Sequence, residues 1–227
     1  MTYKNIKQGT FISRPNRFIA NIEIDGNIEV CHVKNTGRCK ELLVPGATVY
    51  VQEFDSPLRK TKYDLISVYK GDRLVNMDRQ APNKVFKEWA KNHFKNASLV
   101  KSEVKYKNSR FDFYIEENDE KIFVEVKGVT LEDNNIVLFP DAPTERGVKH
   151  INELCDSVEN GYKAYIFFVV QMSGVKYFTP NAKTHPEFAE ALKTASQKGV
   201  NICCVDCIVT SDELKINNYV KVDVDNG

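Results

Sequence analysis

The chain has 227 residues, of which 42% are hydrophobic and 28% charged, and its formal net charge is +1. This composition is ordinary for a soluble globular protein of one large or two small domains, and the net charge neither demands nor excludes an acidic partner. The longest apolar run, Ala164 to Val170, is far shorter than the ~20 residues that a membrane-spanning helix needs. The N-terminus has no apolar signal-peptide core, so we expect a cytoplasmic protein with no membrane partner.

Short strands dominate the first 80 residues. The strands that we predict there are Phe18–Ile24, Ile28–Val33, Ala47–Phe54, Asp64–Tyr69 and Arg73–Met77. Glycine-containing turns separate several of them, as at Asp25-Gly26-Asn27 and Gly71-Asp72. About five short strands in such a segment indicate a small closed or half-closed barrel. The link from Asp78 to Pro82 marks a boundary, so we divide the chain into domains 1–80 and 81–227.

Helices and strands alternate after this boundary. A helix is predicted around Val85 to Phe94, where apolar residues recur at helical spacing. The later segments are strands Leu99–Tyr106, Arg110–Ile115, Lys121–Lys127 and Asn135–Phe139, a helix from about Asp141 to Gly161, strand Lys163–Gln171, helix Pro186–Gln197 and strand Val200–Val209. This order is of the α/β type.

Two of these strands should form a β-hairpin. The link between Arg110–Ile115 and Lys121–Lys127 lacks apolar residues and suits a tight turn at Asn118-Asp119. Side chains alternate across a strand, so the apolar residues of each strand should share one face. These residues are Phe111, Phe113 and Ile115 on the first strand, and Ile122, Val124 and Val126 on the second.

The same turn pairs Asp112 with Glu125, and Arg110 with Lys127. Cβ atoms paired in this way lie roughly 4.5–5.5 Å apart, and like charges at that separation repel. A divalent cation is the simplest reason for two facing carboxylates on an otherwise apolar hairpin. Surface ion pairs on a solvated face are the alternative interpretation, and each would contribute only ~0–1 kcal/mol.

A metal site of this kind allows phosphodiester hydrolysis. Asp112 and Glu125 would ligate Mg²⁺ or Mn²⁺, which prefers oxygen ligands, and Glu103 on the preceding strand is a weaker candidate for a third acid. Lys127 could orient or activate a water, or stabilise charge that develops on the phosphate. Flanking phosphates could be held by three residues of the helix that starts near the hairpin, Arg146, Lys149 and His150.

The hairpin resembles the core of the PD-(D/E)xK nuclease superfamily, with Phe111 in place of the signature proline. Seven segments in order resemble the sugar fermentation stimulation protein A family: Arg14–Phe18, Asn35–Arg38, Leu43–Ala47, Asn76 with Gln80–Asn83, Asn108–Phe113, Glu125–Leu131 and Phe139–Gly147. The resemblance implies an N-terminal OB-like β-barrel followed by a PD-(D/E)xK nuclease-like α/β domain. It also implies non-specific DNA binding and a regulatory link to sugar (maltose) metabolism.

An OB-like barrel binds strands through aromatic residues in a basic groove. The Asn35–Arg38 segment could be a turn with a solvated arginine, but the resemblance favours contact with a phosphate. The nucleic-acid-binding residues that we predict are Arg14, Arg17, Phe18, Asn35, Thr36, Arg38, Arg110, Arg146 and Lys149.

Three functions stay open on the sequence alone. The leading hypothesis is a DNA-binding, Mg²⁺-dependent nuclease that uses Asp112, Glu125 and Lys127. The second is a DNA-binding regulator without turnover, and the third is an enzyme that acts on another phosphoester such as a nucleotide. RNA as the polymer and a homodimer as the assembly are also left open.

Overall fold

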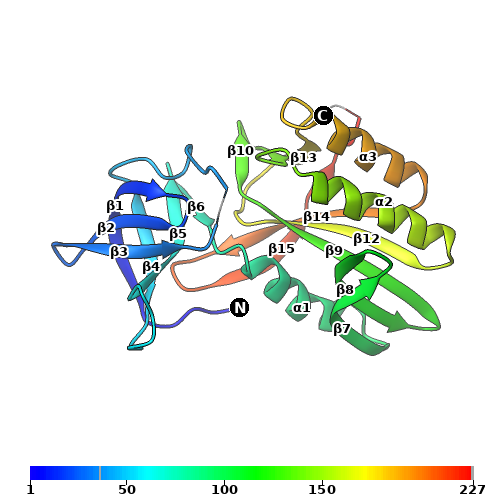
Figure 1. Cartoon of the computed structure of the whole chain (residues 1–227), viewed down its shortest axis with the longest axis horizontal. Helices are drawn as coiled ribbons and strands as arrows, with labels where there is room; N and C mark the ends of the chain where they lie inside the picture. The colour runs from blue at the N-terminus through cyan, green and yellow to red at the C-terminus, as the bar shows by residue number, and fades with distance from the viewer. Residues whose placement is uncertain (36, 226–227) are drawn as a thin grey trace.

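The computed structural model describes residues 1–35 and 37–225, which form two lobes (Figure 1). The strands of the first lobe are β1 (Ile6–Asn16), β2 (Ile19–Ile24), β3 (Asn27–Val33), β4 (Thr48–Glu53), β5 (Tyr63–Lys70) and β6 (Arg73–Asn76). Their order is β3-β2-β1-β4-β5-β6, and a parallel pairing of β3 with β5 closes the first five strands into a barrel. The barrel predicted from the turn spacing is therefore confirmed.

Strand β1 was not among the predicted strands. Its first half pairs with β4 and its second half with β2, so one long strand serves two partners. Gly9 lies where β1 crosses β2, and a Cβ at this position would be 2.7 Å from Glu23 O and Ile22 Cγ2. The glycine that permits this close crossing also weakens the strand pattern in the sequence.

The second lobe holds three helices and two further sheets among the described residues. Its helices are α1 (Ala81–His93), α2 (Glu145–Glu159) and α3 (Pro186–Gln197). The larger sheet has the order β15-β14-β12-β9-β8-β7, with β15 (Leu214–Tyr219), β14 (Asn201–Val209), β12 (Lys163–Val170), β9 (Glu120–Val129), β8 (Ser109–Glu117) and β7 (Ala97–Tyr106). The smaller sheet has the order β10-β11-β13-β16, with β10 (Leu131–Asp133), β11 (Ile136–Phe139), β13 (Tyr177–Pro180) and β16 (Lys221–Val222).

Helices cover both faces of the larger sheet (Figure 1). On one face, the ring of Phe86 in α1 packs 4.8 Å from Phe113 and 4.9 Å from Phe167. On the other face, below α2, Phe111 and Phe123 pack with their ring centroids 5.2 Å apart. The domain is therefore mixed α/β, as predicted. None of the helices in the described part of the chain is long and apolar enough to cross a membrane.

The β8–β9 hairpin has the predicted register. Asn118 and Asp119 both adopt positive φ, at 48° and 66°, as a tight hairpin turn requires. The ladder then runs from Glu117↔Glu120 to Phe113↔Val124. The expected pairs Asp112–Glu125 and Arg110–Lys127 lie beyond this last registered pair.

One predicted face of the hairpin is wrong. Phe111 does not share a face with Phe113: it packs on Phe123 below α2, whereas Phe113 packs on Phe86 of α1. The reason is that β8 pairs with β9 only from Phe113 onward. The residues before Phe113 lie outside this ladder, so the strict alternation of side chains is not maintained through Asp112.

Candidate functional site

Asp112 lies where β8 separates from β9. Its Oδ2 accepts a hydrogen bond of 2.8 Å from the backbone N–H of Val126, and its Oδ1 accepts one of 2.8 Å from Asn83 Nδ2 in the first turn of α1. Burial, and then the negative charge of Glu125, raise the pKa of Asp112 above its ordinary value. The two carboxylates are thus neighbours that repel each other, as the hairpin register predicts.

Glu125 is almost fully buried, with 4% of its side chain exposed. Its Oε1 lies 2.5 Å from both Lys127 Nζ and His150 Nδ1. Its Oε2 is buried and has no hydrogen-bond partner among the described residues. Burial raises the pKa of Glu125, but the hydrogen bond from His150 and the charge of Lys127 together lower it below the ordinary value.

His150 connects this carboxylate to helix α2. Arg146 Nε, one helical turn earlier, donates a hydrogen bond of 3.3 Å to His150 Nε2. Because an imidazole nitrogen that accepts carries no proton, the other nitrogen, Nδ1, carries the proton that is donated to Glu125. The i,i+4 spacing of Arg146 and His150 was visible in the sequence. The contact of His150 with Glu125 depends on how α2 packs on the sheet, whereas the role predicted for His150 was to hold a phosphate.

The remaining predicted residues of this domain lie on the surface. Glu103, the candidate third acid, is exposed, and its carboxylate lies 3.6 Å from Arg110. Lys149 donates a 2.9 Å hydrogen bond to the carbonyl of Asn108. Within residues 1–35 and 37–225, no group of three or more His, Cys, Asp or Glu side chains is arranged to hold a metal ion. Among the described residues, the carboxylates brought together at the candidate site are those of Asp112 and Glu125.

Helix α2 begins at a defined point, which sets the position of Arg146 and His150. Thr144 is the N-cap residue, and its Oγ1 accepts a 3.1 Å hydrogen bond from Gly147 N. An N-cap of this type satisfies a backbone donor that has no partner within the helix. The predicted helix from about Asp141 to Gly161 is thus confirmed.

On the barrel, Arg14 organises the loop that follows β3. Its two terminal nitrogens donate four hydrogen bonds of 2.8–2.9 Å to the carbonyls of Arg17, Asn35, Gly37 and Arg38. Arg14 therefore holds the loop through its backbone. Asn35 Oδ1 accepts a 2.8 Å bond from Gly37 N, whereas Thr36 lies outside the described residues.

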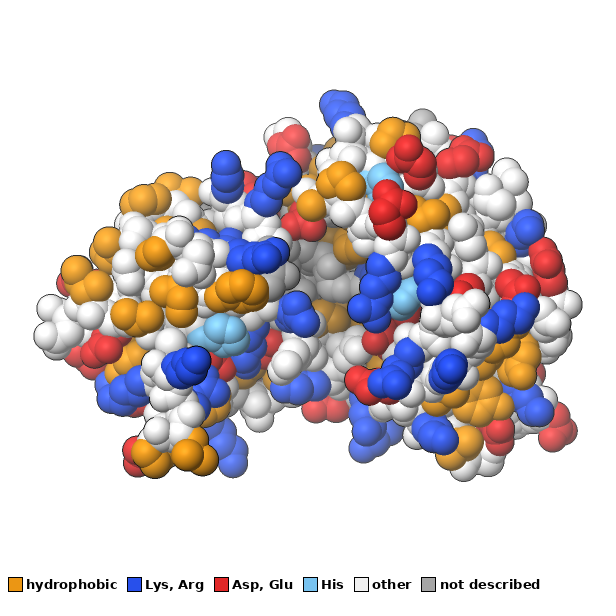
Figure 2. Space-filling model, in the orientation of Figure 1, with side chains coloured by type: hydrophobic (Ala, Val, Ile, Leu, Met, Phe, Trp, Pro, Cys, Tyr) orange, Lys and Arg blue, Asp and Glu red, His pale blue; other side chains and the backbone are white. Residues whose placement is uncertain are grey.

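The same segment forms an open basic pocket of about 450 Å³ on the barrel. Arg17, Arg38 and Lys40 are among its lining residues. Phe18 is 46% exposed, and the guanidinium of Arg17 lies over its ring at 5.1 Å. Figure 2 shows Lys and Arg side chains on both lobes beside the hollow between them. The predicted barrel residues therefore combine exposed cations with one exposed aromatic ring.

Comparison with known proteins identifies the family. Residues 12–77 match the model described as "SfsA N-terminal OB domain", and residues 80–213 match "Sugar fermentation stimulation protein RE domain". The chain belongs to the sugar fermentation stimulation protein (SfsA) family. Curated relatives named "Sugar fermentation stimulation protein homolog" come from Ruminiclostridium cellulolyticum and Clostridium beijerinckii, and are 63% and 62% identical over 224 residues. Each match covers 98% of this chain and 99% of the relative.

A solved structure of the same family has the same architecture. The SfsA of Pyrococcus furiosus, described in complex with Ca²⁺, is 28% identical and superposes with a TM-score of 0.87 over 98% of each chain. The predicted fold class, an OB barrel followed by a mixed α/β domain, is therefore shared by this SfsA relative.

Proposed function

We propose that this SfsA chain binds DNA without sequence specificity and hydrolyses its phosphodiester bonds with Mg²⁺ or Mn²⁺. The observation that carries the proposal is the pair formed by the half-buried Asp112 and the buried Glu125, in which one carboxylate oxygen, Glu125 Oε2, has no hydrogen-bond partner among the described residues. A buried charged oxygen without a partner is costly, so such a group calls for a cation.

The residues at this site fit a hard divalent cation. Asp112 and Glu125 offer carboxylate oxygens, which Mg²⁺ and Mn²⁺ prefer. An ion held there would relieve the repulsion between the two carboxylates and, when bound, would polarise a phosphoryl oxygen. The description of the Pyrococcus furiosus relative in complex with Ca²⁺ supports a divalent-cation site in this family.

The cationic residues around the pair complete the proposed mechanism. Lys127 is 16% exposed and anchored on Glu125, so its ammonium is placed to hydrogen-bond a water or the phosphate. The Arg146 side chain donates from Nε to His150 and forms no other hydrogen bond with the described residues, which leaves its terminal nitrogens for a flanking phosphate. The sequence resemblance to PD-(D/E)xK nucleases assigns Asp112, Glu125 and Lys127 to the same chemistry.

A plasmid-nicking assay tests the proposal. The purified chain should nick supercoiled DNA with Mg²⁺ or Mn²⁺ and not with EDTA. Asp112→Asn and Glu125→Gln should each lower the rate by more than about 100-fold, the upper end of the cost of altering a group outside the ligand set. The matched control is Glu103→Gln, because Glu103 is an exposed carboxylate on the adjacent strand. This variant should cut at the wild-type rate. Metal-dependent nicking that is equal in all four proteins would contradict the proposal.

A DNA-binding regulator without turnover is the second candidate. It is favoured by the basic pocket of the barrel, whose lining residues Arg17, Arg38 and Lys40 need no metal to hold phosphates. In this case binding would weaken steeply with salt but would be indifferent to EDTA and to Glu125→Gln. Absence of nicking together with such binding would select this second function.

A further inference from the structure

A small pocket of about 120 Å³ lies where the two lobes meet. Its walls include Asn35 from the barrel, Arg79 from the link between the lobes, and Thr130 and Gln171 from the second lobe. Thr130 and Gln171 directly follow β9 and β12, which are parallel. The pocket is thus outside the carboxyl ends of parallel strands, where α/β sheets commonly bind ligands. We call it the junction pocket.

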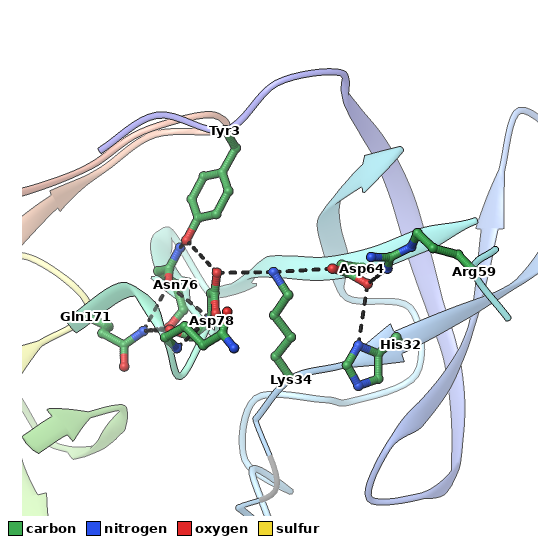
Figure 3. Close-up of polar contacts among 9 residues, drawn as sticks. Tyr3, His32, Lys34, Arg59, Asp64, Asn76, Asp78 and Gln171 are labelled. Carbon is green, nitrogen blue, oxygen red and sulfur yellow. Dashed lines mark hydrogen bonds and ion pairs between the residues drawn. The ribbon is translucent and has the colours of Figure 1, made fainter. Parts of the chain in front are cut away.

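Buried polar contacts hold the walls of the junction pocket in place (Figure 3). Lys34 Nζ lies 3.3 Å from Asp78 Oδ2 and 3.2 Å from Asp64 Oδ2, and Gln171 Nε2 donates to Asn76 and to the carbonyl of Asp78. Lys34 immediately precedes the wall residue Asn35, and Asp78 immediately precedes Arg79. Three wall residues, Asn35, Arg79 and Gln171, therefore adjoin or belong to this network, so this part of the pocket is preorganised.

Gly128 lines the junction pocket and packs closely against the side chains of Gln171 and Pro82. A Cβ on Gly128 would lie 2.7 Å from both Gln171 Oε1 and Pro82 Cγ. Gln171 is held by three hydrogen bonds and the proline ring is rigid, so neither can move aside. Gly128 directly follows Lys127, and Pro82 precedes Asn83, which binds Asp112. The pocket therefore adjoins the place where the proposed function puts the phosphate.

The lining of the junction pocket suits a flat ring with a polar edge. Leu131, Leu138 and Phe139 supply apolar surface, while Asn35 and Thr130 supply hydrogen-bonding groups. Arg79 and Asp141 contribute one charge of each sign, so the lining is not that of a phosphate site. A nucleobase has apolar faces and a hydrogen-bonding edge, and proteins read unpaired bases with this combination of groups. The volume of about 120 Å³ is well below the ~300 Å³ of the smallest clefts for drug-sized ligands, so the pocket is on the scale of one small ring and is too small for a base pair.

We propose that the junction pocket receives one unpaired nucleobase of the DNA strand whose phosphate lies at Asp112 and Glu125. The inference rests on the proposed function and adds a substrate class to it. A base inside a duplex is stacked and paired, so only a single strand or a locally unpaired site presents a base to the pocket. The chain should therefore prefer single-stranded or unpaired DNA to a continuous duplex.

The test measures binding in EDTA, without cleavage, by the fluorescence of 2-aminopurine in a single-stranded oligonucleotide and in the same oligonucleotide paired to its complement. Wild type should bind the single strand about 10-fold more tightly, the scale of one base-stacking contact, and should change the fluorescence of the probe base. Thr130→Trp, which fills the pocket, should abolish both the preference and the fluorescence change while keeping the affinity for the duplex. Ile136→Trp is the matched control, since Ile136 lines the adjacent crevice and should leave both signals intact.

Arg79→Ala is a second variant of an exposed wall residue and should lower the single-strand preference severalfold, even if Thr130→Trp fails to fold. Equal binding of both DNA forms by wild type, or an unchanged preference in folded Thr130→Trp and in Arg79→Ala, would overturn the inference. Displacement of the oligonucleotide by free deoxyadenosine monophosphate at an equal concentration would overturn the assignment to a polymer. Metal-dependent cleavage without a strand preference would refute the junction-pocket inference alone, whereas absence of DNA binding would refute the proposed function as well.

Discussion

Asp112 and Glu125 show how one local environment shifts the pKa values of two neighbouring carboxyl groups in opposite directions. Burial and the charge of Glu125 raise the pKa of Asp112, so the folded chain keeps that proton to a higher pH than the unfolded chain. Burial also raises the pKa of Glu125, but the hydrogen bond from His150 and the charge of Lys127 outweigh it and lower the pKa. The free energy of unfolding should therefore respond to pH with opposite signs at the two residues.

The opposite pH dependence of the free energy of unfolding at the two residues can be tested with one variant of each. As pH rises from about 4, the ordinary carboxyl value, Asp112 makes unfolding progressively easier until its raised folded pKa is passed. Glu125 contributes stability above its ordinary pKa and loses it as pH falls through its lowered folded pKa. Relative to wild type, Asp112→Asn should become more stable as pH rises from about 4 through the raised pKa of Asp112. Glu125→Gln should become less stable as pH rises from the lowered pKa of Glu125 to about 4. Urea unfolding in EDTA at pH values on both sides of about 4 measures both differences, and parallel pH profiles for the two variants would contradict the assignment.

At the scale of elements, the hairpin was predictable and the helix contact was not. The turn at Asn118-Asp119 and the alternation of apolar residues fix the register locally, so the neighbouring carboxylates followed from the sequence. Strand β1 was missed because its pattern is interrupted at Gly9, where two strands cross closely. Phe111 was placed on the wrong face because strand separation after Phe113 has no local sequence signal.

Helix α2 fixes the orientation of Glu125 through His150, and this role can be separated from mere packing. His150→Asn places an amide nitrogen near the position of Nδ1 and should retain the hydrogen bond to Glu125. His150→Gln places its amide nearer the position of Nε2, so the bond to Glu125 should be lost and Mn²⁺ affinity should fall by about 10–100-fold. Titration of bound Mn²⁺ by electron paramagnetic resonance checks the difference. Equal Mn²⁺ affinity in the two variants would show that His150 only fills space.

For the whole molecule, the decisive feature is the buried polar network at the junction of the lobes, in which Gln171 of the second lobe binds Asn76 and Asp78. Lys34 is 16% exposed and stands between Asp64 and Asp78, whose side chains are 1% and 0% exposed. Residues at the N-terminus add to this connection, because the hydroxyl of Tyr3 lies 3.4 Å from Asp78 Oδ2 and Thr2 bridges to Glu213. Two lobes held in this way present the barrel and the carboxylate pair in one fixed arrangement.

Removal of the cation from this network should be costly. Lys34→Met would leave Asp78 buried without its cationic partner, and should lower the free energy of unfolding by about 3–5 kcal/mol. Lys7→Met is the matched control, since Lys7 pairs with Asp25 and Glu53 on the surface, where solvent screens ion pairs, and its loss should cost far less. Urea unfolding compares the two variants. A similar loss in both would show that the network contributes no more than a surface pair.

The sequence by itself determined the barrel, the α/β order and the meeting of Asp112 with Glu125, because alternation, turns and helix caps act between residues close in the chain. The tertiary structure decided what surrounds the pair. His150 reaches Glu125 across 25 positions, and Gln171 reaches Asn76 across 95. Such contacts depend on how α2 packs on the sheet and how one lobe docks on the other, which no local pattern specifies. Glu125 Oε2, the buried oxygen without a hydrogen-bond partner among the described residues, and the junction pocket both arise from that packing.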